Sequence, residues 1–236
     1  MKKSIWKRPG TGLALTAVIG GVVGLVLRFW LENAAIDGRG LLELGHPAHL
    51  SLWVLGLGMT AFFALATLRY QNTTKKAPPP KKSLPAALGC VPAMVSLALS
   101  MLQADNLVIL LLSAMTLAGL VTVALSRFLG KTPPVLSQAA ICVWMVMMLL
   151  QMYRNWSFDP QLHDYCFQLL AYVALSVASY QYAAMDGGMG SDRKLWFWSL
   201  MAAFLCITAM DAGFEYLATA VWVLSGLPKP RLRKAS

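Results

Sequence analysis

Three histidines and several carboxylates are the side chains whose types and spacing fit a binding or catalytic site. His46 and His49 stand three positions apart, and His163 directly precedes Asp164. A neutral imidazole binds a divalent metal ion or accepts a proton, and carboxylates fill the same two roles. The expected outer-face polar cluster comprises His46, His49, Asp159, His163, Asp164, Asp211 and Glu215.

Two predicted helix starts position the histidines. Pro47 and Pro160 suit the first helical position, because a residue there needs no N–H for the helix. His46 is then the predicted N-cap of the first of these helices. Asp159 is the predicted N-cap of the second, and aspartate is a favoured capping residue. The first turns then contain His49, His163 and Asp164. A helix N-terminus is partly positive and keeps an imidazole neutral.

Three interpretations of this cluster stay open. The first interpretation is a divalent metal site formed by His46, His49 and His163. The pair His46 and His49 lacks both the glutamate and the spacing of the zinc protease motif. A solute-binding or transport site is the second. Helix capping at a hydrated boundary is the third, and the sequence favours it. No cofactor motif is present in the sequence, and a non-enzymatic protein is favoured over an enzyme.

Long apolar segments must position these residues. Of 236 residues, 58% are hydrophobic and 13% are charged, whereas soluble domains carry about 25% charged residues. Apolar runs of about twenty residues recur, the length at which a helix crosses about 30 Å of hydrocarbon. Backbone groups in lipid must be paired within their own segment, which favours helices. The sequence therefore predicts an all-α, polytopic transmembrane bundle forming a single integral membrane domain over 1–236.

The apolar runs predict eight helices. Their approximate ranges are 11–30, 47–68, 84–103, 106–128, 134–153, 161–184, 195–211 and 214–227. Pro92 predicts a kink in the third. One span over 195–227 would bury Asp211 and Glu215 near mid-bilayer, at a cost of several kcal/mol each, so a turn is expected at 211–213. Seven helices, or seven and a re-entrant segment, are the alternatives.

Basic residues occupy every second gap between the apolar runs, which fixes the expected orientation. Lys and Arg gather before the first helix, in a proline-rich loop at 69–83 and in a tail at 228–236. Cytoplasmic loops carry this excess, so both termini are expected in the cytoplasm of a plasma-membrane protein. The net charge of +10 does not indicate nucleic-acid binding, because these residues flank apolar segments. The lipid bilayer is the expected partner.

Two helix faces carry further signals. Small residues line the first helix, at Ala14, Ala17, Gly20, Gly21 and Gly24. Such stripes let helices approach closely, here within the chain or, alternatively, against a membrane-protein partner or a second copy. Met145, Met148 and Met152 share a face of the fifth helix, which is typical of packing more than of copper binding.

The starts of the second and sixth helices carry a resemblance. Gly45-His46-Pro47 and Asp159-Pro160 resemble uncharacterised bacterial polytopic membrane proteins, which implies no activity. Three functions remain: a small-solute transport or membrane-embedded binding component, a membrane enzyme with an outward-facing His/carboxylate site, and a structural or accessory protein. The first is favoured, and it predicts a polar cavity that reaches from the outer histidine cluster toward mid-bilayer.

Overall fold

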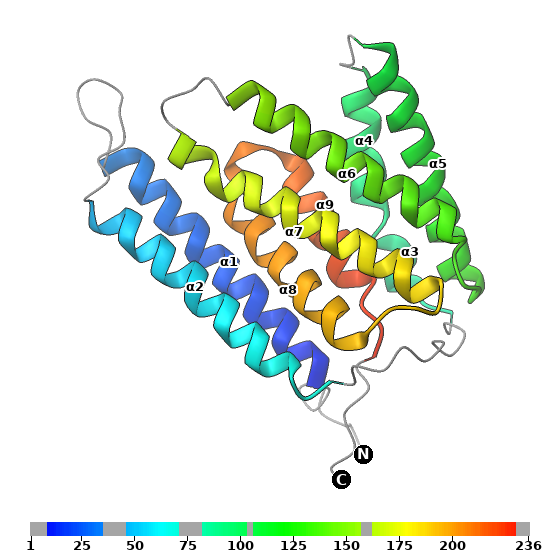
Figure 1. Ribbon diagram of the computed structural model, residues 1–236, viewed down its shortest axis with the longest axis horizontal. Helices are drawn as coiled ribbons and strands as arrows, with labels where there is room; N and C mark the ends of the chain where they lie inside the picture. The colour runs from blue at the N-terminus through cyan, green and yellow to red at the C-terminus, as the bar shows by residue number, and fades with distance from the viewer. Residues whose placement is uncertain (1–8, 35–45, 71–81, 103–105, 157–161, 230–236) are drawn as a thin grey trace.

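The computed structural model describes residues 9–34, 46–70, 82–102, 106–156 and 162–229, and side chains within these ranges except those of residues 9, 156 and 162–165. The regular structure of these ranges is helical, without a strand, which confirms the all-α prediction. The elements are α1 (Pro9–Ala34), α2 (Pro47–Thr67), α3 (Leu84–Leu88), α4 (Val91–Leu102), α5 (Leu107–Leu129), α6 (Val135–Trp156), α7 (Leu162–Asp186), α8 (Asp192–Thr208), the 3-10 turn η2 (Met210–Ala212) and α9 (Phe214–Ser225) (Figure 1).

Five segments of the described chain are long and apolar enough to cross a membrane. They are Gly10–Ala34, Pro47–Thr67, Leu84–Leu102, Leu107–Leu129 and Val135–Asn155. Many of their large apolar side chains point away from the protein; Leu57 of α2, for example, is 67% exposed. An apolar surface of this kind matches a hydrocarbon solvent. The chain therefore has the helices of a membrane protein.

Helix α8 is the centre of the bundle. In Figure 1 it lies between the α1–α2 pair on one side and α7 with α9 on the other. Every side chain of α8 from Ser199 to Thr208 is buried. A helix surrounded by protein needs no lipid-facing surface, which explains why α8 carries polar residues such as Ser199 inside the bundle.

The helices alternate in direction along the chain, with α3 and α4 running the same way as one interrupted segment, so helix ends gather at two ends of the bundle (Figure 1). The end of α1, the starts of α2 and α9 and the turn η2 lie at one end, called here the histidine end. The start of α1 and the ends of α2, α5, α7 and α9 lie at the opposite, basic end (Figure 1).

The third predicted helix is divided in two, which corrects the expectation of one helix over 84–103. Helix α3 ends at Leu88 and α4 begins at Val91. Pro92 has no N–H to donate to the carbonyl of Leu88, so the helical ladder is interrupted at this point. Gly89 lies in the break, where any side chain would collide with Ser225 of α9.

The last apolar stretch breaks at the turn that the sequence predicts. Helix α8 ends at Thr208, η2 follows, and α9 begins at Phe214 after the extended residue Gly213. Asp211 belongs to η2 and Glu215 to the first turn of α9, so both acids lie at this break rather than halfway along a helix.

Candidate functional site

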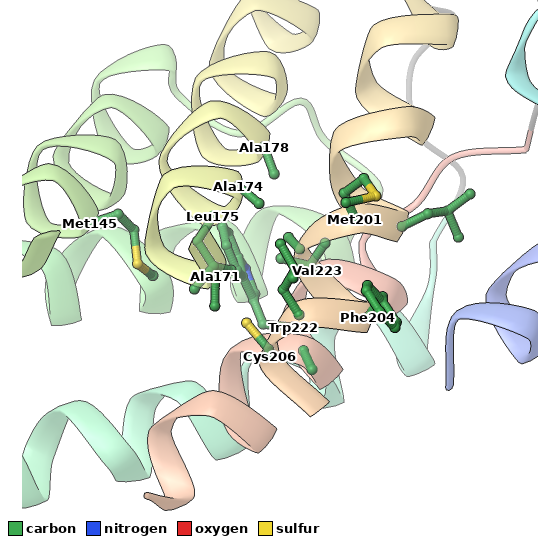
Figure 2. Close-up of a cluster of buried hydrophobic side chains, with 14 of the residues drawn as sticks. Met145, Ala171, Ala174, Leu175, Ala178, Met201, Phe204, Cys206, Trp222 and Val223 are labelled. Carbon is green, nitrogen blue, oxygen red and sulfur yellow. The ribbon is translucent and has the colours of Figure 1, made fainter. Parts of the chain in front are cut away.

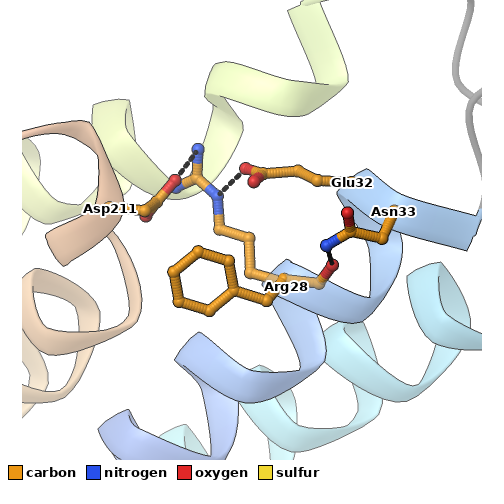
Figure 3. A network of polar contacts seen from close by, with 5 residues as sticks. Arg28, Glu32, Asn33 and Asp211 are labelled. Carbon is orange, nitrogen blue, oxygen red and sulfur yellow. Dashed lines mark hydrogen bonds and ion pairs between the residues drawn. The ribbon is translucent and has the colours of Figure 1, made fainter.

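A buried arginine binds two of the acids at the histidine end. Arg28, whose side chain is 7% exposed, places Nη2 3.1 Å from Oδ2 of Asp211 and Nε 3.4 Å from Oε1 of Glu32 (Figure 3). Glu32 is one turn further along α1, whereas Asp211 belongs to η2. The side chain of Asp211 is 13% exposed. Asp211, expected in the outer cluster, therefore joins α1 to the α8–α9 turn.

Glycines let α1 approach α8 closely enough for this ion pair. A Cβ added to Gly24 would lie 2.5 Å from Oγ1 of Thr208, and one added to Gly21 would lie 2.6 Å from Cβ of Ile207. Gly20 lies against Met59 of α2 and Phe204 of α8. The small-residue stripe therefore faces helices of the same chain. Within it, Ala17 is fully buried and Ala14 is half-buried.

The two described histidines serve the start of α2. His46 is its N-cap, as predicted, and Nδ1 accepts a hydrogen bond of 3.3 Å from the backbone N–H of Ala48. The His46 ring also packs edge-on against Trp30 of α1, with 5.7 Å between centroids. His49 Nε2 accepts a bond of 3.1 Å from Nε1 of Trp53. One nitrogen of each imidazole is thus used as an acceptor within the protein.

The metal hypothesis receives no support from the side chains that the structure describes. Among them, no group of three or more His, Cys, Asp or Glu residues lies close enough to hold a metal ion. Asp159 and the side chains of His163 and Asp164 fall outside the described residues. A metal held by His46, His49 and His163 stays a prediction.

A cavity lies between α9 and the helices α4, α5, α6 and α7. Its volume is about 170 Å³, below the 300–1,000 Å³ that is typical of drug-sized ligands. Its polar lining consists of Ser96, Ser100, Thr116, Tyr172, Glu215 and Thr219. Met145 and Trp222 belong to its wall, and Figure 2 shows both within a buried apolar cluster that extends to Phe204.

The cavity runs from the histidine end into the bundle. Glu215, Thr219 and Trp222 follow one another along α9 at spacings of four and three residues and line the cavity together. At 1.5 Å per residue they cover about 10 Å along the helix axis. The sequence predicts a polar cavity that begins at the histidines, whereas no described histidine lines this one and Glu215 stands at its histidine end.

Hydroxyl groups turn the cavity into an acceptor-rich environment. Ser100 Oγ donates to the carbonyl of Ser96 at 3.1 Å, and Thr116 Oγ1 donates to that of Leu112 at 2.8 Å. Thr219 Oγ1 donates to the carbonyl of Glu215, also at 2.8 Å. Each of these hydroxyls has a carbonyl acceptor one turn earlier in its own helix, so its hydrogen is used within the protein and oxygen lone pairs remain available to a ligand.

Glu215 is the charged group of the cavity. It is the second residue of α9, where the partial positive charge of the helix N-terminus stabilises a carboxylate. The carboxylate lies directly over Gly213, and any side chain at position 213 would collide with it. Within the described ranges, both ion pairs involve Arg28 and neither involves Glu215.

Aromatic rings complete the wall. Trp144, Tyr172 and Trp222 all line the cavity, and the ring of Tyr172 packs edge-on against Tyr216 at 5.5 Å. No lysine or arginine is among the residues that line it. A cation is attracted to a carboxylate and to the face of an aromatic ring, which is electrostatically negative.

A second buried arginine fastens the basic end. Arg127 is 7% exposed; its guanidinium carbon lies 5.6 Å from the ring centre of Tyr182, and Nη1 lies 3.9 Å from Sγ of Cys90. Tyr182 in turn donates a bond of 2.7 Å to the carbonyl of Val223. Gly226 leaves room for the guanidinium, since a Cβ there would lie 2.8 Å from it. This group holds α5, α7 and α9 together.

No family model matches this chain, and no curated protein or solved structure matches it. Sequence reasoning selected Glu215 but missed its hydroxyl-bearing neighbours, because serine and threonine in apolar helices resemble packing residues. A sequence feature that does coincide with the cavity is the methionine face of the fifth predicted helix, because Met145 and Met148 both line the cavity.

Proposed function

We propose that this protein is a plasma-membrane protein with eight membrane-crossing segments that binds, and as a transport component passes on, a small organic cation in the cavity of Glu215. Both termini are cytoplasmic, and the histidine end faces outward. The alternating helix directions support this topology, since α1 begins and α9 ends at the basic end (Figure 1).

The observation that carries the proposal is the carboxylate of Glu215 in a small, acceptor-rich and aromatic cavity. A cation gains an ion pair with Glu215 and cation–π contacts with the aromatic wall. An anion would meet a carboxylate and no basic side chain among the residues that line the cavity. The volume restricts the ligand to a few heavy atoms, as in a methylated or hydroxylated ammonium ion.

The position of Glu215 supports access from the outer side. It stands at the histidine end, and the hydroxyls of Thr219 and Thr116 continue the polar lining inward. In secondary transporters, sites near the bilayer midplane open alternately to either side. A binding component needs the outer access alone, whereas a transporter needs a second opening toward the basic end.

Calorimetric titration of the detergent-purified protein tests the proposal. The probes are tetramethylammonium, choline and 3,3-dimethyl-1-butanol, the last a neutral molecule with the shape of choline. We expect the two cations to bind, and the neutral analogue to bind at least about tenfold more weakly, equivalent to about 1.4 kcal/mol. Equal affinity for choline and its neutral analogue, or no heat with any probe, would overturn the proposal.

A further inference from the structure

A groove separates α2 from α8 at the basic end. Its volume is about 280 Å³, and its lining consists of Ala64, Thr67, Arg193, Lys194, Phe197 and Trp198. Tyr70, just beyond α2, packs edge-on against Trp196 of α8 with 5.5 Å between ring centroids. This contact fixes the end of one helix against the start of the other, while the small side chain of Ala64 leaves the space between them.

Two cations stand at the rim of this groove. Arg193 and Lys194 lie in the first turn of α8, and within the described part of the chain neither forms an ion pair. The adjacent Asp192 is 2% exposed, so its side chain lies below the surface on which the groove opens. The partial positive charge of the α8 N-terminus adds to theirs. The rim therefore attracts a negatively charged group.

The wall of the groove is apolar and begins one helical turn away from this rim. Phe197 follows Arg193 by four residues and Trp198 follows Lys194 by four, so each aromatic lies on the same helix face as a basic residue. The two rings pack edge-on at 5.1 Å. On α2, Ala64 adds a small apolar side chain to the same groove.

We propose that this groove binds one anionic phospholipid, with its phosphate between Arg193 and Lys194 and an acyl chain along Ala64, Phe197 and Trp198. Charge at the rim and apolar surface one turn deeper reproduce the amphipathic order of a lipid at a membrane boundary. Basic pockets between helices on the cytoplasmic side bind such headgroups. A water-soluble phosphate would leave the aromatic wall uncovered. The lipid site is separate from the cavity of Glu215.

Bound lipid would also stabilise the bundle, because it contacts both α2 and α8. A ligand that binds only the folded state raises the unfolding temperature by mass action. The dependence on lipid headgroup is therefore measurable without knowledge of the protein's activity.

Native mass spectrometry and thermal unfolding of the full chain in detergent micelles test the proposal. Added phosphatidylglycerol is compared with phosphatidylcholine of the same acyl chains, and with glycerol phosphate as the headgroup alone. We expect one retained phosphatidylglycerol and a higher unfolding temperature, at least tenfold weaker retention of phosphatidylcholine, and no effect of glycerol phosphate. Equal retention of the two lipids, or equal protection by glycerol phosphate, would overturn the proposal.

The matched variants carry the same change of charge. Arg193→Gln with Lys194→Gln removes both groove cations, whereas Lys131→Gln with Lys229→Gln removes two exposed cations elsewhere among the described residues. We expect phosphatidylglycerol retention to fall at least tenfold in the first pair and less than twofold in the second. Equal losses in both pairs would show a general surface charge effect and would overturn a site in the groove.

Discussion

Asp211 and Glu215 come from one turn of the chain, yet they serve opposite sides of the molecule. Asp211 points toward α1 and pairs with the buried Arg28 at 3.1 Å. Glu215 lines the cavity between α9 and α4–α7, and no described cation pairs with it. These two acids lie at the same end of the bundle, but only one of them faces a described cation. The paired carboxylate holds helices together, whereas the proposed function assigns the unpaired one to a ligand.

The closeness of helix packing also differs between the α1 side and the cavity side of the bundle. On the α1 side, Gly21 and Gly24 bring two backbones together and leave no space for a further methyl group. On the cavity side, the large side chains of Trp144 and Met145 hold α6 away from α9 and leave a cavity of about 170 Å³. The bundle therefore combines a close-packed half with a half that surrounds a cavity.

The largest effect is expected from Arg28→Met. This variant leaves Asp211 and Glu32 without their cation, and breaking a buried pair by removing one partner costs about 3–5 kcal/mol. Because Glu32 is 42% exposed, we expect the lower value, about 3 kcal/mol. Thermal unfolding in detergent measures the loss, and Arg28→Lys should recover part of it. An unchanged unfolding temperature would contradict the role of the ion pair.

A smaller loss is expected from Gly24→Ala. The new Cβ would meet Oγ1 of Thr208 at 2.5 Å, and overpacking of this kind costs about 1–3 kcal/mol. Gly58→Ala is the matched control, because nothing lies within 4 Å of a Cβ at that position of α2. Unfolding curves of the two variants should separate clearly. Equal stability would show that α1 and α8 are not in close contact.

His46→Ala distinguishes capping from metal binding. Loss of an N-cap costs about 1 kcal/mol, so a drop of that size in stability is expected. His46→Asn should restore stability, because asparagine is a good N-cap. If a metal ion is the main partner of His46, the asparagine variant should fail, and metal analysis by mass spectrometry of the wild-type protein should show a bound ion.

The smallest effect is expected from Thr116→Val, which keeps the shape of the cavity and removes one acceptor. A hydrogen bond contributes about 0.5–1.5 kcal/mol net, so affinity for choline should fall roughly threefold. Thr16→Val is the control, since this threonine makes the same type of bond to the carbonyl of Gly12 but lies on α1. Equal losses of choline affinity in both variants would show that Thr116 does not contact the ligand.

Local features of this fold are readable from the sequence. The N-cap at His46 followed from the proline beside it, and the break between α8 and α9 followed from two acids that a single span would have buried. The division of α3 from α4 was only partly expected, because Pro92 indicated a kink while the close approach of Ser225 to Gly89 depends on α9.

Pairings between distant segments were not readable. Nothing near Arg28 in the sequence indicates that η2 supplies its partner. The threonines of the cavity have the same local pattern as Thr16 on α1, since each donates to a carbonyl four residues earlier. Which of these residues face a cavity is decided by helix packing, which the spacing of one helix does not specify.

The most direct test compares Glu215→Gln with Asp211→Asn, two substitutions of the same chemistry in the same turn. For each variant, choline affinity by calorimetry and thermal stability in detergent are measured together. We expect Glu215→Gln to lose at least about tenfold in affinity, or about 1.4 kcal/mol, with little change in stability. Asp211→Asn should lower stability and keep the affinity of the folded protein. If Glu215→Gln binds choline as tightly as the wild-type chain, the central claim is wrong.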